Sequence, residues 1–235
     1  MTRSAVKQFY EENASKYASD FYTIPRWNSF RQFVASQIPT LPTAPRIVDI
    51  GCGPCPSLPS LTKNASCYVA LDGSRANLFA IQKSTGSVIP VQIELESESA
   101  LPLHTGFDLA ICFGIFQYLG TPRILVEQIA DILKPGGYLL IHNPSDYWTP
   151  HMGKLHGRGL NRQELLSLIS GSFDPVWFYS FHHVELERFF TIWLSRLPIA
   201  PSLVRIVWWN LFRLEKQLSR LGNVGTDWLM IARRR

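Results

Sequence analysis

The sequence predicts an α/β protein built on a doubly wound, mostly parallel seven-stranded sheet with helices on both faces. From residue 46 onward, short apolar runs typical of buried strands alternate with segments of helical periodicity. This alternation indicates parallel strands joined by helical crossovers. The run Phe107–Phe113 is almost wholly apolar, which is typical of a strand covered on both faces. The length of 235 residues and the hydrophobic fraction of 46% fit one core with additions at its edges.

Two helices are expected before the sheet. Aromatic and aliphatic residues recur near helical spacing over 6–18 and over 28–38. Prolines then stiffen the chain, so residues 1–45 are expected to form an N-terminal helical segment and residues 46–183 the core. The linker prolines are Pro39, Pro42 and Pro45.

Strands and helices then follow one another through the core. Ser74 is placed to cap one helix, and Pro122 suits the first turn of another, which Pro135-Gly136-Gly137 ends. The expected strands are Arg46–Ile50, Cys67–Leu71, Val88–Leu95, Phe107–Phe113, Tyr138–His142, Phe173–Phe181 and Asp227–Ala232. The expected helices are 75–84, 122–133 and 161–169.

A helical insertion is expected at 184–223, before a last strand and a basic tail at 224–235. After Pro201, a helix over 202–221 has one aliphatic face and one mainly basic face. We interpret it as a cap on the core, and a peripheral contact with a membrane surface is the alternative. The aliphatic face comprises Leu203, Val204, Val207, Leu211, Leu214, Leu218 and Leu221. The opposite face comprises Arg205, Trp209, Arg213, Lys216 and Arg220, flanked by Trp208 and Phe212.

The segment Arg46–Pro56 combines a short buried strand with a turn that contains Gly51 and Gly53. Glycine tolerates positive φ and lets a ligand approach the backbone closely. A dinucleotide-binding turn is disfavoured, because Pro56 stands where the third glycine of G-x-G-x-x-G belongs. A second interpretation is redox chemistry, because Cys52-Gly53-Pro54-Cys55 matches the thioredoxin tetrapeptide letter for letter.

Two carboxylates favour a third interpretation, a nucleoside-binding turn. Asp49 stands two residues before Gly51, and Asp72 directly follows the next expected strand. A carboxylate about 20 residues past the glycines is placed to accept hydrogen bonds from a ribose diol. Redox chemistry explains neither carboxylate.

In combination, these motifs resemble class I S-adenosylmethionine-dependent methyltransferases. The resemblance implies a Rossmann-like methyltransferase fold, S-adenosyl-L-methionine as the cofactor, and the first helices as a lid. The matching segments are Val48–Pro54 for the first motif, Ala70–Ser74 for the ribose-binding loop, Leu101–Leu103 with Phe107–Ala110 for the entry to the fourth strand, and Leu133–Ile141 for the fifth strand.

The same resemblance implies the residues of the cofactor site. Asp49 would lie near the amino group of the methionine moiety, Asp72 would hold the ribose hydroxyls, and Glu96 or Ser97 would contact the adenine. Tyr17 would belong to the lid. The other implied contacts are Gly51, Cys52, Gly53, Gly73, Ser74, Phe113 and Gly114.

The expected activity is methyl transfer to a small, apolar or lipid-like acceptor. A general base is needed only if the acceptor carries a proton at working pH, and His142, which ends the fifth strand, is the candidate. Two alternatives stay open: a thiol–disulfide oxidoreductase using Cys52 and Cys55, and a non-catalytic membrane or partner adaptor with the same fold.

Composition and charge indicate the cellular compartment and the classes of partner. The N-terminus lacks the apolar core of a signal peptide, and four cysteines in or beside strands suit reduced thiols, so a cytoplasmic protein is expected. No His and Cys residues have the spacing of a zinc site. The net charge is +5, but the basic residues concentrate in the insertion and tail rather than around the strand ends, so nucleic acid is not expected as a partner.

Overall fold

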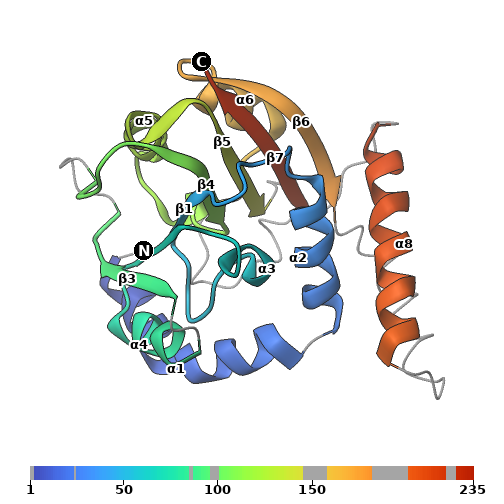
Figure 1. Cartoon of the computed structure of the whole chain (residues 1–235), viewed down its shortest axis with the longest axis horizontal. Coiled ribbons are helices and arrows are strands. Elements are labelled where there is room, and N and C mark those ends of the chain that lie inside the picture. The colour runs from blue at the N-terminus through green and yellow to red at the C-terminus, as the bar shows by residue number, and fades with distance from the viewer. Residues whose placement is uncertain are drawn as a thin grey trace.

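The computed structural model shows a seven-stranded sheet in the order β3-β2-β1-β4-β5-β7-β6 (Figure 1). Strands β1 to β5 run parallel to one another, and β7 is antiparallel to both β5 and β6. The predicted mostly parallel sheet is therefore confirmed. The structure describes residues 3–23, 25–84, 87–95, 101–144, 158–181, 201–220 and 226–235. The strands are β1 (Arg46–Ile50), β2 (Cys67–Asp72), β3 (Val88–Gln92), β4 (Phe107–Phe113), β5 (Leu133–Pro144), β6 (Phe173–Phe181) and β7 (Asp227–Arg234).

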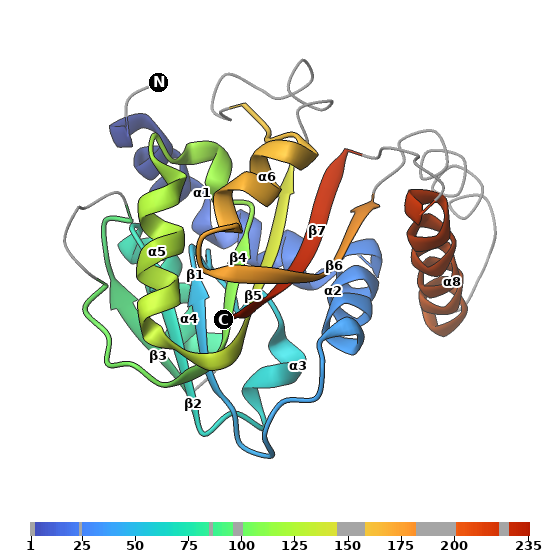
Figure 2. The ribbon, with the colours of Figure 1, turned by 90° about the horizontal axis from the view of Figure 1, so that it is seen from above.

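Helices cover both faces of the sheet, as Figure 2 shows from above. One apolar cluster joins the sheet to α5 and α6, and a second joins it to α2, α4 and α8. The α-helices are α1 (Arg3–Thr23), α2 (Pro25–Gln37), α3 (Pro59–Thr62), α4 (Arg75–Ser84), α5 (Pro122–Ile132), α6 (Arg162–Ile169) and α8 (Pro201–Arg220), and η1 (Phe116–Tyr118) is a 3-10 helix.

Several boundaries differ from those expected. The first helix, α1, is longer than expected at both ends, and α2 begins three residues earlier, so one residue separates them in the sequence. Strand β3 ends at Gln92 instead of Leu95. β5 begins at Leu133, because this residue already pairs with Phe107 of β4. The register between the two strands then shifts, so that the next pair is Leu109 with Tyr138 and the Pro-Gly-Gly segment lies between the two pairs. The glycines that were expected to separate the helix from the strand thus lie inside the strand.

The orientation of α8 differs from the predicted one. Trp208 and Phe212 are buried, whereas Leu203 and Leu214 are 53% and 41% exposed. The ring of Phe212 packs 5.2 Å from that of Phe30 in α2. The helix is therefore turned so that its aromatic residues face the core, because burying large rings removes more apolar area from water than burying leucines.

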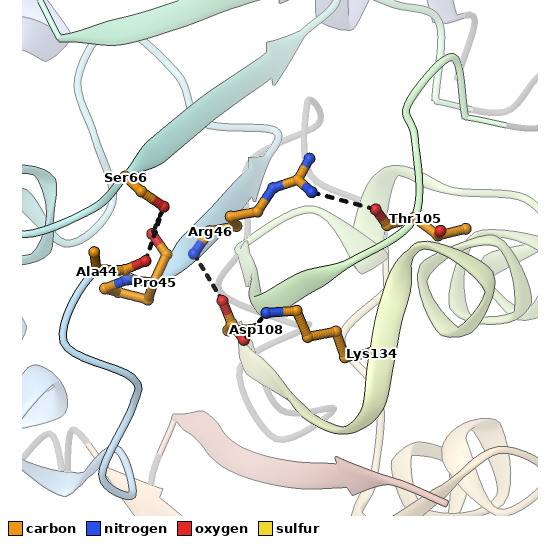
Figure 3. A network of polar contacts seen from close by, with 7 residues as sticks. All are labelled: Ala44, Pro45, Arg46, Ser66, Thr105, Asp108 and Lys134. Atoms are coloured by element: carbon orange, nitrogen blue, oxygen red, sulfur yellow. Dashed lines mark hydrogen bonds and ion pairs between the residues drawn. The ribbon is translucent and has the colours of Figure 1, made fainter.

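Asp108 fastens the amino ends of three neighbouring strands, on the edge of the sheet away from the strand tips that end at Ile50 and Phe113 (Figure 3). Its carboxylate accepts a hydrogen bond of 2.8 Å from the Arg46 amide of β1 and forms an ion pair of 2.6 Å with Lys134 of β5. The carboxylate is buried and has two charged or backbone donors, so its role in the fold is structural.

Candidate functional site

A cavity of about 250 Å³ opens at the carboxyl ends of β1, β2 and β4. The chain order reverses between β1 and β4, and ligands of doubly wound sheets bind at such a switch point. Much of the wall is apolar. The lining residues are Val6, Lys7, Tyr10, Gly51, Cys52, Gly53, Pro54, Ser57, Asp72, Gly73, Ser74, Asn77, Ile93, Glu94, Leu95, Phe113, Gly114, Ile115, Tyr118 and Leu119.

The turn after β1 forms one wall of this cavity. Gly51 and Gly53 have φ angles of +67° and +63°, which residues with a Cβ adopt only at a cost. A Cβ on Gly51 would lie 2.1 Å from Cγ2 of Ile115, whereas a Cβ on Gly53 would meet no atom within 4 Å. Gly51 is therefore needed for packing, and Gly53 keeps the cavity open to a ligand.

Asp72, at the end of β2, lies directly opposite the turn and is tied to it. Its Oδ2 accepts a hydrogen bond of 2.8 Å from the Gly53 amide, and its Oδ1 accepts bonds from the Ser74 amide at 2.8 Å and from Asn77 Nδ2 at 3.2 Å. Burial raises the pKa of this carboxyl group, and the three donors oppose the rise. Each carboxylate oxygen can accept more than one bond, so the cavity side of Asp72 can receive ligand hydroxyls.

Helix α1 lies along the open side of the cavity and contributes Val6, Lys7 and Tyr10 to its lining. Lys7 pairs with Glu94 at 2.7 Å, and the hydroxyls of Tyr10 and Tyr118 are 2.9 Å apart. These contacts join α1 to the segments after β3 and β4, so the helix partly closes the site.

Glu11 of α1 holds the same helix to the N-terminus of α4. Its two carboxylate oxygens accept hydrogen bonds from the amides of Arg75 and Ala76, at 2.7 Å and 3.0 Å. The first amides of a helix lack intrahelical partners and favour a negative charge, so Glu11 serves α4 as a cap from another element. The predicted cap is confirmed too, because Ser74 Oγ accepts the Asn77 amide at 3.2 Å.

Asp49 lies behind the turn and not in the cavity wall. It is fully buried, and its carboxylate accepts bonds from the Ser57 amide, the Ser57 hydroxyl and the Tyr68 hydroxyl at 2.7 to 2.8 Å. Burial raises the pKa of Asp49 to about 6 despite these three donors. Ser57, which Asp49 holds, does line the cavity, so Asp49 orients one of the groups that a ligand would meet.

His142 lies two residues before the end of β5 and is also outside the cavity lining. It is 7% exposed, and its ring lies 5.1 Å from the ring of Phe113, which does line the cavity. Its other near neighbours are Phe30, with ring centroids 5.3 Å apart, and Asp227, whose Oδ2 is 3.7 Å from Nε2. Its role as a base stays a prediction.

Cys52 and Cys55 are buried free thiols, at 4% and 0% exposed. Burial raises the pKa of Cys55 to about 12, and burial beside Asp72 and Asp49 raises the pKa of Cys52 well above its usual value. A reactive C-x-x-C motif needs the opposite shift, toward the thiolate at neutral pH. The environment of these thiols disfavours the oxidoreductase interpretation.

The structure brings together eight of the predicted cofactor-site residues on one cavity: Gly51, Cys52, Gly53, Asp72, Gly73, Ser74, Phe113 and Gly114. Glu96 and Ser97 lie outside the described residues, as does the side chain of Tyr17, whose backbone belongs to α1. The segment just before them, Ile93 to Leu95, does line the cavity.

Sequence reasoning missed several lining residues. Asn77 stands one helical turn after Ser74, a spacing that places both at the same helix start. Lys7 and Glu94 are 87 positions apart, and no local pattern links them. The set of lining groups suits an adenosine-type ligand: a carboxylate for hydroxyls, an open glycine turn, and apolar side chains for a base.

Comparison with known proteins identifies the family of this chain. A family profile described as a methyltransferase domain matches residues 21–191. The chain therefore belongs to the methyltransferase-domain family, and it is a class I methyltransferase whose methyl donor is S-adenosyl-L-methionine. No curated protein sequence matches it significantly.

Solved structures share the fold at low sequence identity. N-methyltransferase NodS from Bradyrhizobium japonicum, solved with S-adenosyl-L-homocysteine, has a TM-score of 0.67 and 12% identity, and 98% of each chain is covered. A chain of the complex between the Haloferax volcanii Trm112 methyltransferase activator and a methyltransferase has a TM-score of 0.67 and 17% identity, over 97% of this chain and 96% of that one. Geranyl diphosphate C-methyltransferase from Streptomyces coelicolor has a TM-score of 0.64 and 14% identity, over 88% and 80%.

Proposed function

We propose that this enzyme transfers the methyl group of S-adenosylmethionine to a small, apolar or lipid-like acceptor. The donor would lie between the Gly51–Gly53 turn and Asp72, with the ribose hydroxyls on the Asp72 carboxylate. The observation that carries this placement is the 2.8 Å bond between the Gly53 amide and Asp72, which fixes a carboxylate against an open glycine turn. The residues after β3, Ile93 to Leu95, would hold the adenine.

The character of the cavity wall supports an apolar acceptor. Phe113, Ile115 and Leu119 follow β4, and Val6 of α1 adds to the same cavity. Groups of this kind offer contact area but few hydrogen-bond partners for a polar acceptor. A lipid-like acceptor partitions into membranes, so the proposal includes a peripheral membrane contact through α8. No helix among the described residues is long and apolar enough to cross a bilayer.

When bound, S-adenosylmethionine supplies a methyl group that its sulfonium already activates. The protein's part is then to align the acceptor and to exclude water, which α1 and its contacts to Glu94 and Tyr118 would do. His142 enters the proposal as a base only for an acceptor that carries a proton at neutral pH. His142 packs against Phe113 and is not part of the cavity lining, so this role would require a rearrangement that brings the His142 ring to the acceptor.

Calorimetry with S-adenosylhomocysteine tests the donor site. Asp72→Asn places an amide group against the donors of the turn and removes the charge that would bind the ribose, so we expect at least a tenfold loss of affinity, about 1.4 kcal/mol. Asp108→Asn is the matched control. Asp108 is likewise a buried carboxylate that accepts a backbone hydrogen bond, but it lies at the amino ends of the strands, away from the cavity. Equal affinities of both variants for S-adenosylhomocysteine would overturn the placement.

The acceptor class needs a separate test. Cell extract is incubated with enzyme and methyl-labelled S-adenosylmethionine, and the products are divided between organic and aqueous phases. We expect enzyme-dependent label in the organic phase, and the Asp72→Asn variant should lose it. Enzyme-dependent label found only in water-soluble products would refute an apolar acceptor while leaving the donor site in place.

A further inference from the structure

A second hollow, of about 210 Å³, lies between α2 and α8, two helices that stand side by side in Figures 1 and 2. Its lining residues are Ser29, Gln32, Arg205, Ile206 and Trp209. None of them belongs to the cavity at the strand ends. The hollow is therefore a separate feature, and the proposed methyl-donor site gives it no role.

The polar groups of this hollow are hydrogen-bond donors without partners in the described part of the chain. Ser29 is 1% exposed, and its buried hydroxyl forms no hydrogen bond there. A buried hydroxyl without a partner is costly, and one on the wall of a hollow is placed for a ligand atom. Arg205 and the indole N–H of Trp209 add donors that form no hydrogen bond or ion pair with described residues.

The exposed charged residues of the two helices that line the hollow are all basic in the described part of the chain. The sequence of α2 contains no acidic residue. Glu215 is the single acid of α8, and it is fully buried on the face turned to the core. An arginine with free donors, a buried hydroxyl and an amide, with no carboxylate beside them among the described residues of α2 and α8, are groups suited to bind a phosphate.

The exposed face of α8 around the hollow is both apolar and basic. Leu203 and Ile206 are 53% and 56% exposed, and Leu214 is 41% exposed on the same face. Arg213 is exposed there and forms no ion pair with described residues. Exposed aliphatic side chains, free arginines and a half-buried tryptophan are the composition of a helix that lies on an anionic bilayer.

We infer that the hollow between α2 and α8 binds the phosphate of an anionic phospholipid, while Leu203 and Ile206 enter the bilayer surface beside it. Arg205 and Ser29 hold the phosphate oxygens, and Trp209 lies at the level of the headgroups. Lys216 and Arg220 keep α8 in place from the protein side, since both lie against the ring of Tyr179 of β6. The inference rests on the proposed membrane contact and is independent of the methyl-donor site.

Flotation of the full chain with vesicles of phosphatidylcholine, with and without phosphatidylglycerol, tests this site. We expect binding only to the anionic vesicles. Arg213→Gln removes a surface charge and should weaken binding about fivefold. Arg205→Gln also removes the guanidinium group from the wall of the hollow, so it should weaken binding about tenfold or more. Arg123→Gln is the matched control, because it removes the same charge from an exposed side chain of α5, on the other face of the sheet. This variant should bind vesicles like the unmodified protein.

Ser29→Ala separates a phosphate site from general electrostatic attraction. It changes no charge and removes a hydroxyl without a partner, so the folded protein should be as stable as before, yet vesicle binding should fall about two- to tenfold. Vesicle binding that is the same for Ser29→Ala and the unmodified protein would overturn the headgroup site. Binding of inorganic phosphate without any affinity for vesicles would assign the hollow to a soluble phosphate and overturn the lipid. Affinity for S-adenosylhomocysteine should stay unchanged in every variant, so that failure here leaves the donor site standing.

Discussion

Replacing Gly51 by alanine should destabilise the protein through two separable effects. The first is the backbone: an alanine at a φ of +67° costs about 1–2 kcal/mol. The second is contact, since the new Cβ would lie 2.1 Å from Cγ2 of Ile115, far inside the usual carbon–carbon separation of about 3.5–4.0 Å. Ile115 is buried and cannot withdraw freely, and overpacking of this kind costs about 1–3 kcal/mol. The expected total is about 2–5 kcal/mol.

Gly53→Ala is the matched control for the backbone effect. Its φ of +63° is nearly the same, but its Cβ would meet no atom within 4 Å. Only the backbone cost of about 1–2 kcal/mol should remain in the free protein. In contrast, Gly53→Ala should weaken S-adenosylhomocysteine binding by about tenfold or more, because its Cβ would occupy space that the ligand needs.

Urea unfolding of single and double variants measures the contact directly. Ile115→Ala removes the clashing Cγ2, so it should recover part of the loss in Gly51→Ala, with a coupling energy of at least about 1 kcal/mol. The same change combined with Gly53→Ala should be additive within about 0.5 kcal/mol. If Gly51→Ala and Gly53→Ala lose the same stability, or if Ile115→Ala couples equally to both, the steric reasoning is refuted.

Three further predictions concern single carboxylates and His142. Asp49 has a pKa of about 6 in the folded protein against 3.8 in the unfolded chain, so its contribution to stability is full below pH 3.8 and falls by about 3 kcal/mol as the pH rises to 6. Urea unfolding at pH values from about 3.5 to about 7 should show this loss relative to Asp49→Asn, and parallel curves would contradict it. Glu11→Ala should cost about 1 kcal/mol, since it uncaps α4. Glu12→Ala should cost less, because among the described residues the Glu12 carboxylate accepts a hydrogen bond from Gln8 alone; equal losses in thermal unfolding would exclude the cap. If His142 is the base, His142→Gln should lower kcat by about 10²-fold or more and leave S-adenosylhomocysteine affinity unchanged; an unaltered kcat would leave His142 a structural residue.

The core and the glycine turn were predictable because local physics dominates there. Apolar runs bounded by glycine and proline define β1, β2 and β4, and parallel pairing of β1 with β2 necessarily brings Asp72 beside the turn. The sign of φ at Gly51 and Gly53 follows from the sharp reversal after a buried strand. Residue type and order were sufficient for these features.

The parts that were mispredicted or missed depend on contacts between distant segments. The aliphatic and the aromatic faces of α8 overlap in sequence, and packing of Phe212 against Phe30 decides between them. Similarly, the contact of Tyr10 with Tyr118 joins positions 108 apart. Asp49 turns inward because Ser57 and Tyr68 satisfy its oxygens there, and no periodic pattern indicates that choice.

The most direct test of the account is a crystal structure of the enzyme with S-adenosylhomocysteine. We expect the two ribose hydroxyls within hydrogen-bond distance of the Asp72 carboxylate, about 2.5–3.0 Å, and the homocysteine moiety along Gly51 and Gly53. A ligand bound elsewhere, or one whose ribose leaves Asp72 without contact, would contradict the central claim.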